Sequence, residues 1–84
     1  MGSYIDGNTL LHWAAKMGMV DRIKKRLENG DNINAQNKLG QTPLHVAYKN
    51  GKIEFAISLL GHGAATDIRD NEGKIAFELD ISKM

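Results

Sequence analysis

The chain has 84 residues, of which 42% are hydrophobic and 25% charged, which suits one small globular domain and excludes a disordered tail. Eleven basic residues against ten acidic ones give a net charge of +1, which favours neither nucleic acid nor a membrane as the partner. The lack of cysteine excludes disulfides and fits an intracellular, cytoplasmic setting. No apolar run is long enough to span a membrane, and no signal-peptide segment follows Met1.

The first predicted unit covers about residues 4–36 and begins with an inner helix. Thr9 is placed to cap this helix, because its hydroxyl can accept a hydrogen bond from the first turn. The helix is expected over residues 10–17. Gly18 suits the left-handed position that often ends a helix.

The outer helix of this unit is expected to begin at Asp21, since a carboxylate stabilises the positive end of the helix dipole. Ile23 and Leu27 are four residues apart and form its apolar stripe. Arg22 and Arg26 stand where the next unit has apolar residues, which predicts a solvent-facing cap at this end. The basic run that contains them is interpreted as a solvated face rather than a nucleic-acid site.

The second predicted unit covers about residues 37–69 and repeats this pattern. Thr42 caps its inner helix, and Pro43 occupies the first helical position, where a missing N–H costs nothing. The outer helix carries Phe55 and Leu59. We expect these two side chains at the centre of the interface with the first unit.

The third unit, about residues 70–84, is a fragment of the same pattern. Gly73 is retained, but Ile75 replaces the capping threonine and Glu78 replaces the histidine. Polar residues at positions that internal repeats keep apolar predict an outer end of the stack, with no further outer helix before Met84. The sequence therefore predicts two full repeats and a C-terminal half repeat.

The fixed offset between the units is the strongest signal in the sequence. Residues 7–12 (GNTLLH) return as residues 40–45 (GQTPLH), and residues 30–35 (GDNINA) form the linker between them. A period near 33 with a T-P-L-H core is the signature of ankyrin repeats. The chain resembles the ankyrin-repeat family over about residues 4–79. The resemblance implies an all-α solenoid of stacked helix-turn-helix units joined by β-hairpin-like loops.

The motif residues are expected to be structural. In the family, the histidine bonds the threonine hydroxyl and the nearby backbone, which the resemblance implies here. Two histidines that recur one full period apart in the same motif are better explained by the repeat than by catalysis or metal binding. No carboxylate pair or phosphate-binding loop is present, so we expect no enzyme, no metal and no cofactor. The residues given this structural role are Thr9, His12, Thr42, Pro43 and His45.

The predicted function is a protein-protein interaction module that binds a partner through a concave face. The family lines that face with the residue after the histidine, here Trp13, although Trp13 could instead cover the inner helix at the uncapped N-terminal end. Trp13, Leu39 and Val46 are expected to form an apolar centre, ringed by lysines that favour an acidic rim on the partner. The partner-binding positions assigned by register are Asn8, Trp13, Lys16, Met17, Lys38, Leu39, Gln41, Val46, Lys49, Asn50, Asn71, Glu72 and Lys74.

The alternative is a structural or self-associating element that completes its fold by oligomerisation or within a larger assembly. Ile53, Ile57 and Leu60 fall at i, i+4 and i+7, one stripe of the second outer helix. A following repeat would cover this stripe, and without one it could pair with another copy. The expected state is a monomer or a weakly self-associating species.

Overall fold

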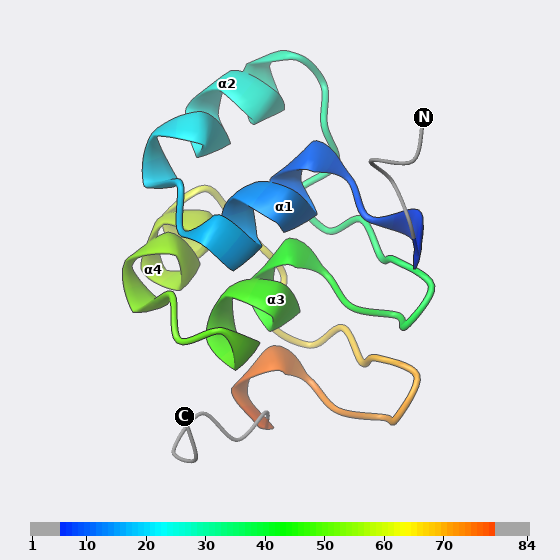
Figure 1. Ribbon diagram of the computed structural model, residues 1–84. Coiled ribbons are helices and arrows are strands. Elements are labelled where there is room, and N and C mark those ends of the chain that lie inside the picture. The colour runs from blue at the N-terminus through cyan, green and yellow to red at the C-terminus, as the bar shows by residue number, and fades with distance from the viewer. Residues whose placement is uncertain (1–5, 79–84) are drawn as a thin grey trace.

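The computed structural model describes residues 6–78, and this part of the chain contains four α-helices and no β-strand (Figure 1). The inner helices α1 (Leu10–Met17) and α3 (Pro43–Lys49) pack side by side. The outer helices α2 (Ile23–Glu28) and α4 (Ile53–Gly61) form the second layer. The connecting turns project to the other side, so the predicted helical repeat architecture is confirmed.

Both inner helices begin at the predicted threonine caps. The hydroxyls of Thr9 and Thr42 accept hydrogen bonds from the backbone N–H groups of His12 and His45, each at 3.3 Å. Each histidine ring in turn accepts a bond from the backbone N–H of its threonine, which completes a capping box. Gly18 ends α1 with a φ of 73°, the left-handed conformation expected there.

The start of the first outer helix corrects the prediction. Asp21 does not open an α-helix but lies in a 3-10 helix, η2 (Val20–Arg22), and α2 begins at Ile23. The preceding residues, Met19 and Val20, have no side-chain oxygen that could cap an α-helix. The chain therefore enters through a tighter turn, in which the Arg22 N–H bonds the Met19 carbonyl at 3.0 Å.

The core lies between the two helical layers. Phe55 and Leu59 are fully buried, whereas Arg22, the register equivalent of Phe55, is exposed. Arg26 is only partly exposed, and its Nε lies 3.2 Å from Oδ2 of Asp31. The polar cap is therefore present, and one of its two charges is neutralised by an ion pair. The other large buried apolar side chains are Leu11, Ile23 and Leu44.

Turns built on one side-chain motif connect the units. Oδ1 of Asn37 accepts bonds from the N–H groups of Leu39 and Gln41, each at 2.9 Å. Asp70, the register equivalent of Asn37, makes the same pair of bonds in the third turn. Such bonds stabilise tight loops without strand pairing. The expected hairpin-like loops are present as turns, and no strand is assigned within residues 6–78.

Successive turns are hydrogen-bonded to one another. The Lys38 N–H donates to the Asp6 carbonyl at 2.7 Å, and the Asn71 N–H donates to the Leu39 carbonyl at 2.9 Å. Gly40 has a φ of 77° at this contact, where a Cβ would lie 2.8 Å from the Asn71 nitrogen. These bonds hold each turn against the next one along the chain.

The third unit packs its 3-10 helix, η3 (Ala76–Glu78), against α3. The Phe77 ring meets the Tyr48 ring edge-on, with centroids 5.3 Å apart and an interplanar angle of 81°. Oε1 of Glu78 accepts a bond from the Ile75 N–H at 2.8 Å, as the motif histidines do in the first two units. The expected absence of a further outer helix concerns residues 79–84, which lie outside the described residues.

Candidate functional site

The motif histidines connect each inner helix to the next turn. Nδ1 of His12 accepts the backbone N–H of Thr9 at 3.0 Å, so the ring proton lies on Nε2. That Nε2–H donates to the Gln41 carbonyl at 2.7 Å. His45 makes the equivalent bond to the Lys74 carbonyl at 2.9 Å. Both rings are buried, and each uses Nδ1 in the cap of its own helix and Nε2 in a bond to the next unit.

Burial lowers the pKa of His12 below its ordinary value of 6.5, and the bonds to the Gln41 and Ala35 carbonyls offset part of this effect. The ring is therefore neutral at neutral pH, as its two hydrogen bonds require. Within residues 6–78, no three histidine or carboxylate side chains come together as a metal site. No helix of that part is long and apolar enough to cross a membrane.

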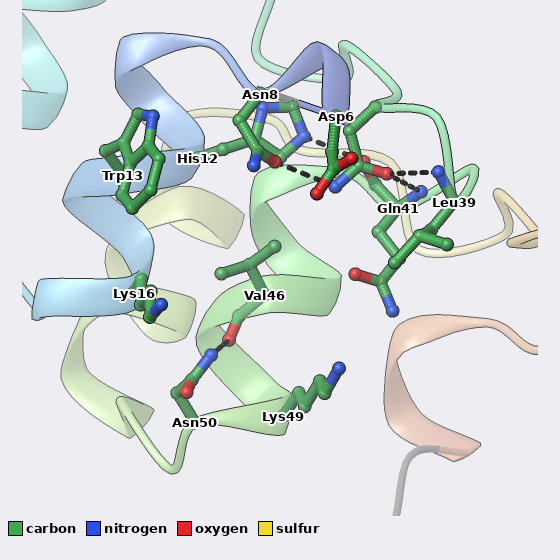
Figure 2. A pocket seen from close by; sticks show the side chains of 11 residues that line it. Asp6, Asn8, His12, Trp13, Lys16, Leu39, Gln41, Val46, Lys49 and Asn50 are labelled. Carbon is green, nitrogen blue, oxygen red and sulfur yellow. Dashed lines mark hydrogen bonds between the residues drawn. The ribbon is translucent and has the colours of Figure 1, made fainter. Parts of the chain in front are cut away.

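A groove of about 280 Å³ lies where the turns meet the inner helices, and Figure 2 shows its lining. Val46 of α3 is 9% exposed and forms part of its floor. Trp13 of α1 is half-buried, and Leu39 on the second turn is 53% exposed. All three line the groove, so the side chains that we expected at its apolar centre lie around one hollow.

Charged side chains stand at two ends of this groove. Asp6 lies at the turn end, four residues before α1 begins, and is exposed. Lys16 and Lys49 lie in the last turns of α1 and α3 and are also exposed. Nζ of Lys16 is 5.5 Å from the centroid of the Trp13 ring, a cation–π contact. The groove is therefore acidic at its turn end and basic at its helix end.

Hydrogen bonds hold the polar lining in place. Oδ1 of Asn8 accepts a bond from Nδ2 of Asn37 at 2.9 Å. Nδ2 of Asn50 donates to the Val46 carbonyl at 2.8 Å. Gln41 is buried, with its N–H and its carbonyl both bonded. Side chains ordered before binding lose little entropy when a partner docks.

The structure brings most of the predicted partner-binding residues into this one groove and leaves the rest outside it. Met17 is 63% exposed at the end of α1 but does not line the groove, and Lys38 is exposed on the second turn. The residues of the third turn are exposed below the groove rather than in it. Those inside are Asn8, Trp13, Lys16, Leu39, Gln41, Val46, Lys49 and Asn50, and those of the third turn are Asn71, Glu72 and Lys74.

Three lining residues were not predicted as such. Asp6 is the register equivalent of Leu39, so the same reasoning that assigned Leu39 could have found it. Asn37 was given no role in the sequence analysis, and His12 was interpreted only as a structural residue. Asn37 and His12 face the groove because of contacts between units, and no local sequence pattern indicates such contacts.

Comparison with known proteins matches this architecture. The family model for ankyrin repeats, in three copies, matches residues 11–79. The chain belongs to the ankyrin-repeat family. It is 38% identical over 73 residues to Rabankyrin-5 of Mus musculus, covering 86% of this chain and 6% of that protein. It is 42% identical over 66 residues to palmitoyltransferase Hip14 of Drosophila melanogaster, covering 77% of this chain and 10% of that protein.

A third relative is the E3 ubiquitin-protein ligase KEG of Arabidopsis thaliana, 36% identical over 80 residues, with 93% of this chain and 5% of that protein covered. The ankyrin-repeat chain thus spans a tenth or less of the length of these relatives. Ankyrin repeats are generally protein-protein interaction modules and typically non-catalytic. The palmitoyltransferases among the relatives are similar through their ankyrin regions.

Proposed function

We propose that this ankyrin-repeat chain is a non-catalytic module that binds a partner protein in the groove between its turns and inner helices. The general role of the family supports this class of function. The observation that carries the proposal is the apolar centre of the groove, in which Trp13 and Leu39 stand on either side of the Val46 floor. An apolar anchor surrounded by a polar rim is the usual anatomy of a protein interface.

The energetics favour an apolar side chain of the partner at this centre. Each methylene group buried there contributes about 0.8 kcal/mol. Leu39 is more than half exposed, so it has apolar surface left to bury on binding. Lys16 and Lys49 at the rim favour acidic groups on the partner, each pair adding roughly 0.2–1 kcal/mol.

The experiment is an alanine test with a partner obtained by pull-down. Trp13→Ala and Leu39→Ala should each weaken the affinity measured by calorimetry by more than about 1 kcal/mol. Ile57→Ala is the matched control, because Ile57 is 62% exposed but lies on the outer layer, away from the groove. Unchanged affinity in both groove variants, with normal melting, would place the site elsewhere.

A second candidate is pairing with another copy of the chain through the outer helices. Ile53 and Ile57 on α4 are 42% and 62% exposed, and Leu60 is half-buried beside them. Val20, the register equivalent of Ile53, is 37% exposed. These residues provide an apolar strip of the kind that marks contacts between molecules.

Light scattering at two concentrations tests this second candidate. Pairing predicts a mass that rises with concentration in the wild-type chain, and Ile57→Glu should keep the chain monomeric by placing a charge in the strip. Lys24→Glu, at the equivalent position on α2, is the control. A wild-type chain that stays monomeric at the higher concentration would remove this candidate.

A further inference from the structure

The charges of the groove have no counter-ions within the described chain. The ion pairs among residues 6–78 join Arg26 to Asp31 and Arg69 to Glu78, all outside the groove. Asp6, at the turn end, and the two lysines at the helix end therefore remain able to pair with charges of another molecule. Lys16 also keeps its contact with the Trp13 ring, which holds its ammonium group beside a ring that lines the groove.

The spacing of these charges sets the length of chain that would connect them. Asp6 lies four residues before α1 begins at Leu10, and Lys16 lies in the last turn of that helix, so the two charges stand at opposite ends of the groove (Figure 2). An extended peptide rises roughly 3.3 Å per residue, so a short extended segment can contact both ends. Val46 lies between the two ends in Figure 2, so the middle of such a segment would meet apolar surface.

We infer that the groove selects an extended segment of the partner that is acidic at one end, apolar in the middle and basic at the other end. The acidic end pairs with Lys16 and Lys49, the apolar side chain lies against Val46, and the basic end pairs with Asp6. A uniformly acidic or polyanionic ligand fits less well, because its far end would face Asp6. This inference rests on the proposed function of the groove and specifies the partner's chemistry.

Capped pentapeptides are the probes for this experiment. One carries two aspartates, a central leucine and two lysines, and the other two replace all four charges with aspartate or with lysine. The chain has one tryptophan, Trp13, and it lines the groove, so its emission reports binding there. The wild-type chain should bind the mixed-charge peptide about tenfold more tightly than either uniform peptide, because each uniform peptide loses at least one exposed ion pair and gains at least one like-charge contact.

Charge variants of the groove should change this order of preference. The double variant Lys16→Glu, Lys49→Glu should bind the lysine peptide most tightly. The control is Lys24→Glu with Lys25→Glu on α2, which has the same net charge and should keep the wild-type order of affinities. Asp6→Asn should remove the preference for the mixed-charge peptide over the aspartate peptide. Asparagine suits the Asp6 backbone, whose φ is 66°. Asp67→Asn is the exposed control for that change.

Melting curves of all variants verify that they are folded. Equal binding of the three peptides, or binding of none at millimolar concentration, overturns the inference. The proposed function is judged separately, by the effect of Leu39→Ala on a protein partner. A partner lost in that variant while the peptides bind equally would leave the groove as the site and refute only its charge selectivity.

Discussion

Truncating Phe55 to alanine should remove a large part of the stability of this chain. Phe55 is 0% exposed and belongs to the core cluster that α1, α3 and α4 share. It is the largest fully buried side chain of the described residues. We expect its ring at the interface between the two full repeats, and nearest-neighbour interfaces carry most of the stability of a repeat array.

The magnitude follows from burial. Replacing a fully buried phenylalanine by alanine costs about 3–5 kcal/mol, from the lost transfer free energy and the cavity together. A domain of this size has a free energy of unfolding of roughly 4–13 kcal/mol, so the variant is left marginally stable or unfolded. At about 4–8 °C per kcal/mol, the melting temperature should fall by more than about 12 °C.

Thermal melts followed by circular dichroism measure this effect against two controls. Arg22→Ala changes the register equivalent of Phe55 in the first repeat, which is exposed, and Lys24→Ala changes the exposed outer face of α2. Both should lie within about 0.5 kcal/mol of the parent. If Phe55→Ala melts within a few degrees of the parent, the assignment of this interface is wrong, and the argument for a polar cap at Arg22 fails with it.

Two further predictions concern the contacts between units. The pKa of folded His12 is lowered below the value of about 6.5 that it has when unfolded. Its contribution to the free energy of unfolding should therefore be fully present above pH 6.5 and be lost as the pH falls below that value. Urea midpoints between pH 7.5 and 5 should show this loss, which His12→Gln reduces and the exposed His62→Gln leaves unchanged. Gly40→Ala should cost more stability than Gly30→Ala in the same urea titration, because both glycines have positive φ but only the Cβ added at Gly40 meets Asn71. Equal costs would mean that the turns do not pack as tightly as the structure shows.

The inner helices were predictable because their signals are local. Thr9 and Gly18 specify the two ends of α1 within one short stretch of sequence, and the structure places both ends as expected. The first outer helix lacks such a cap, and its start was assigned wrongly from the charge of Asp21 alone. A carboxylate near a helix start is a weaker constraint than a capping side chain, since it stabilises the dipole without satisfying a backbone group.

The groove was predictable in composition but not in extent. From the register of the repeats we predicted that Trp13, Leu39 and Val46 share one surface, and in the structure all three line the groove. It assigned both Lys16 and Met17 to the groove, although adjacent residues of a helix point in directions about 100° apart, and only Lys16 lines it. The bond from His12 to the Gln41 carbonyl joins residues 29 positions apart, and nothing in either local sequence indicates it.

Stability and recognition depend on the same contacts in this molecule. His12 lines the groove and also bonds the Gln41 carbonyl, so the groove exists only while the first repeat is seated on the second. The described part of the chain has one interface between full repeats, and the packing of the third unit against α3 does not involve α1 or the first turn. A core substitution therefore lowers the apparent affinity by the fraction of chains that are unfolded, even where it leaves every groove side chain intact. Affinities of groove variants can be compared only after each is corrected for its own stability.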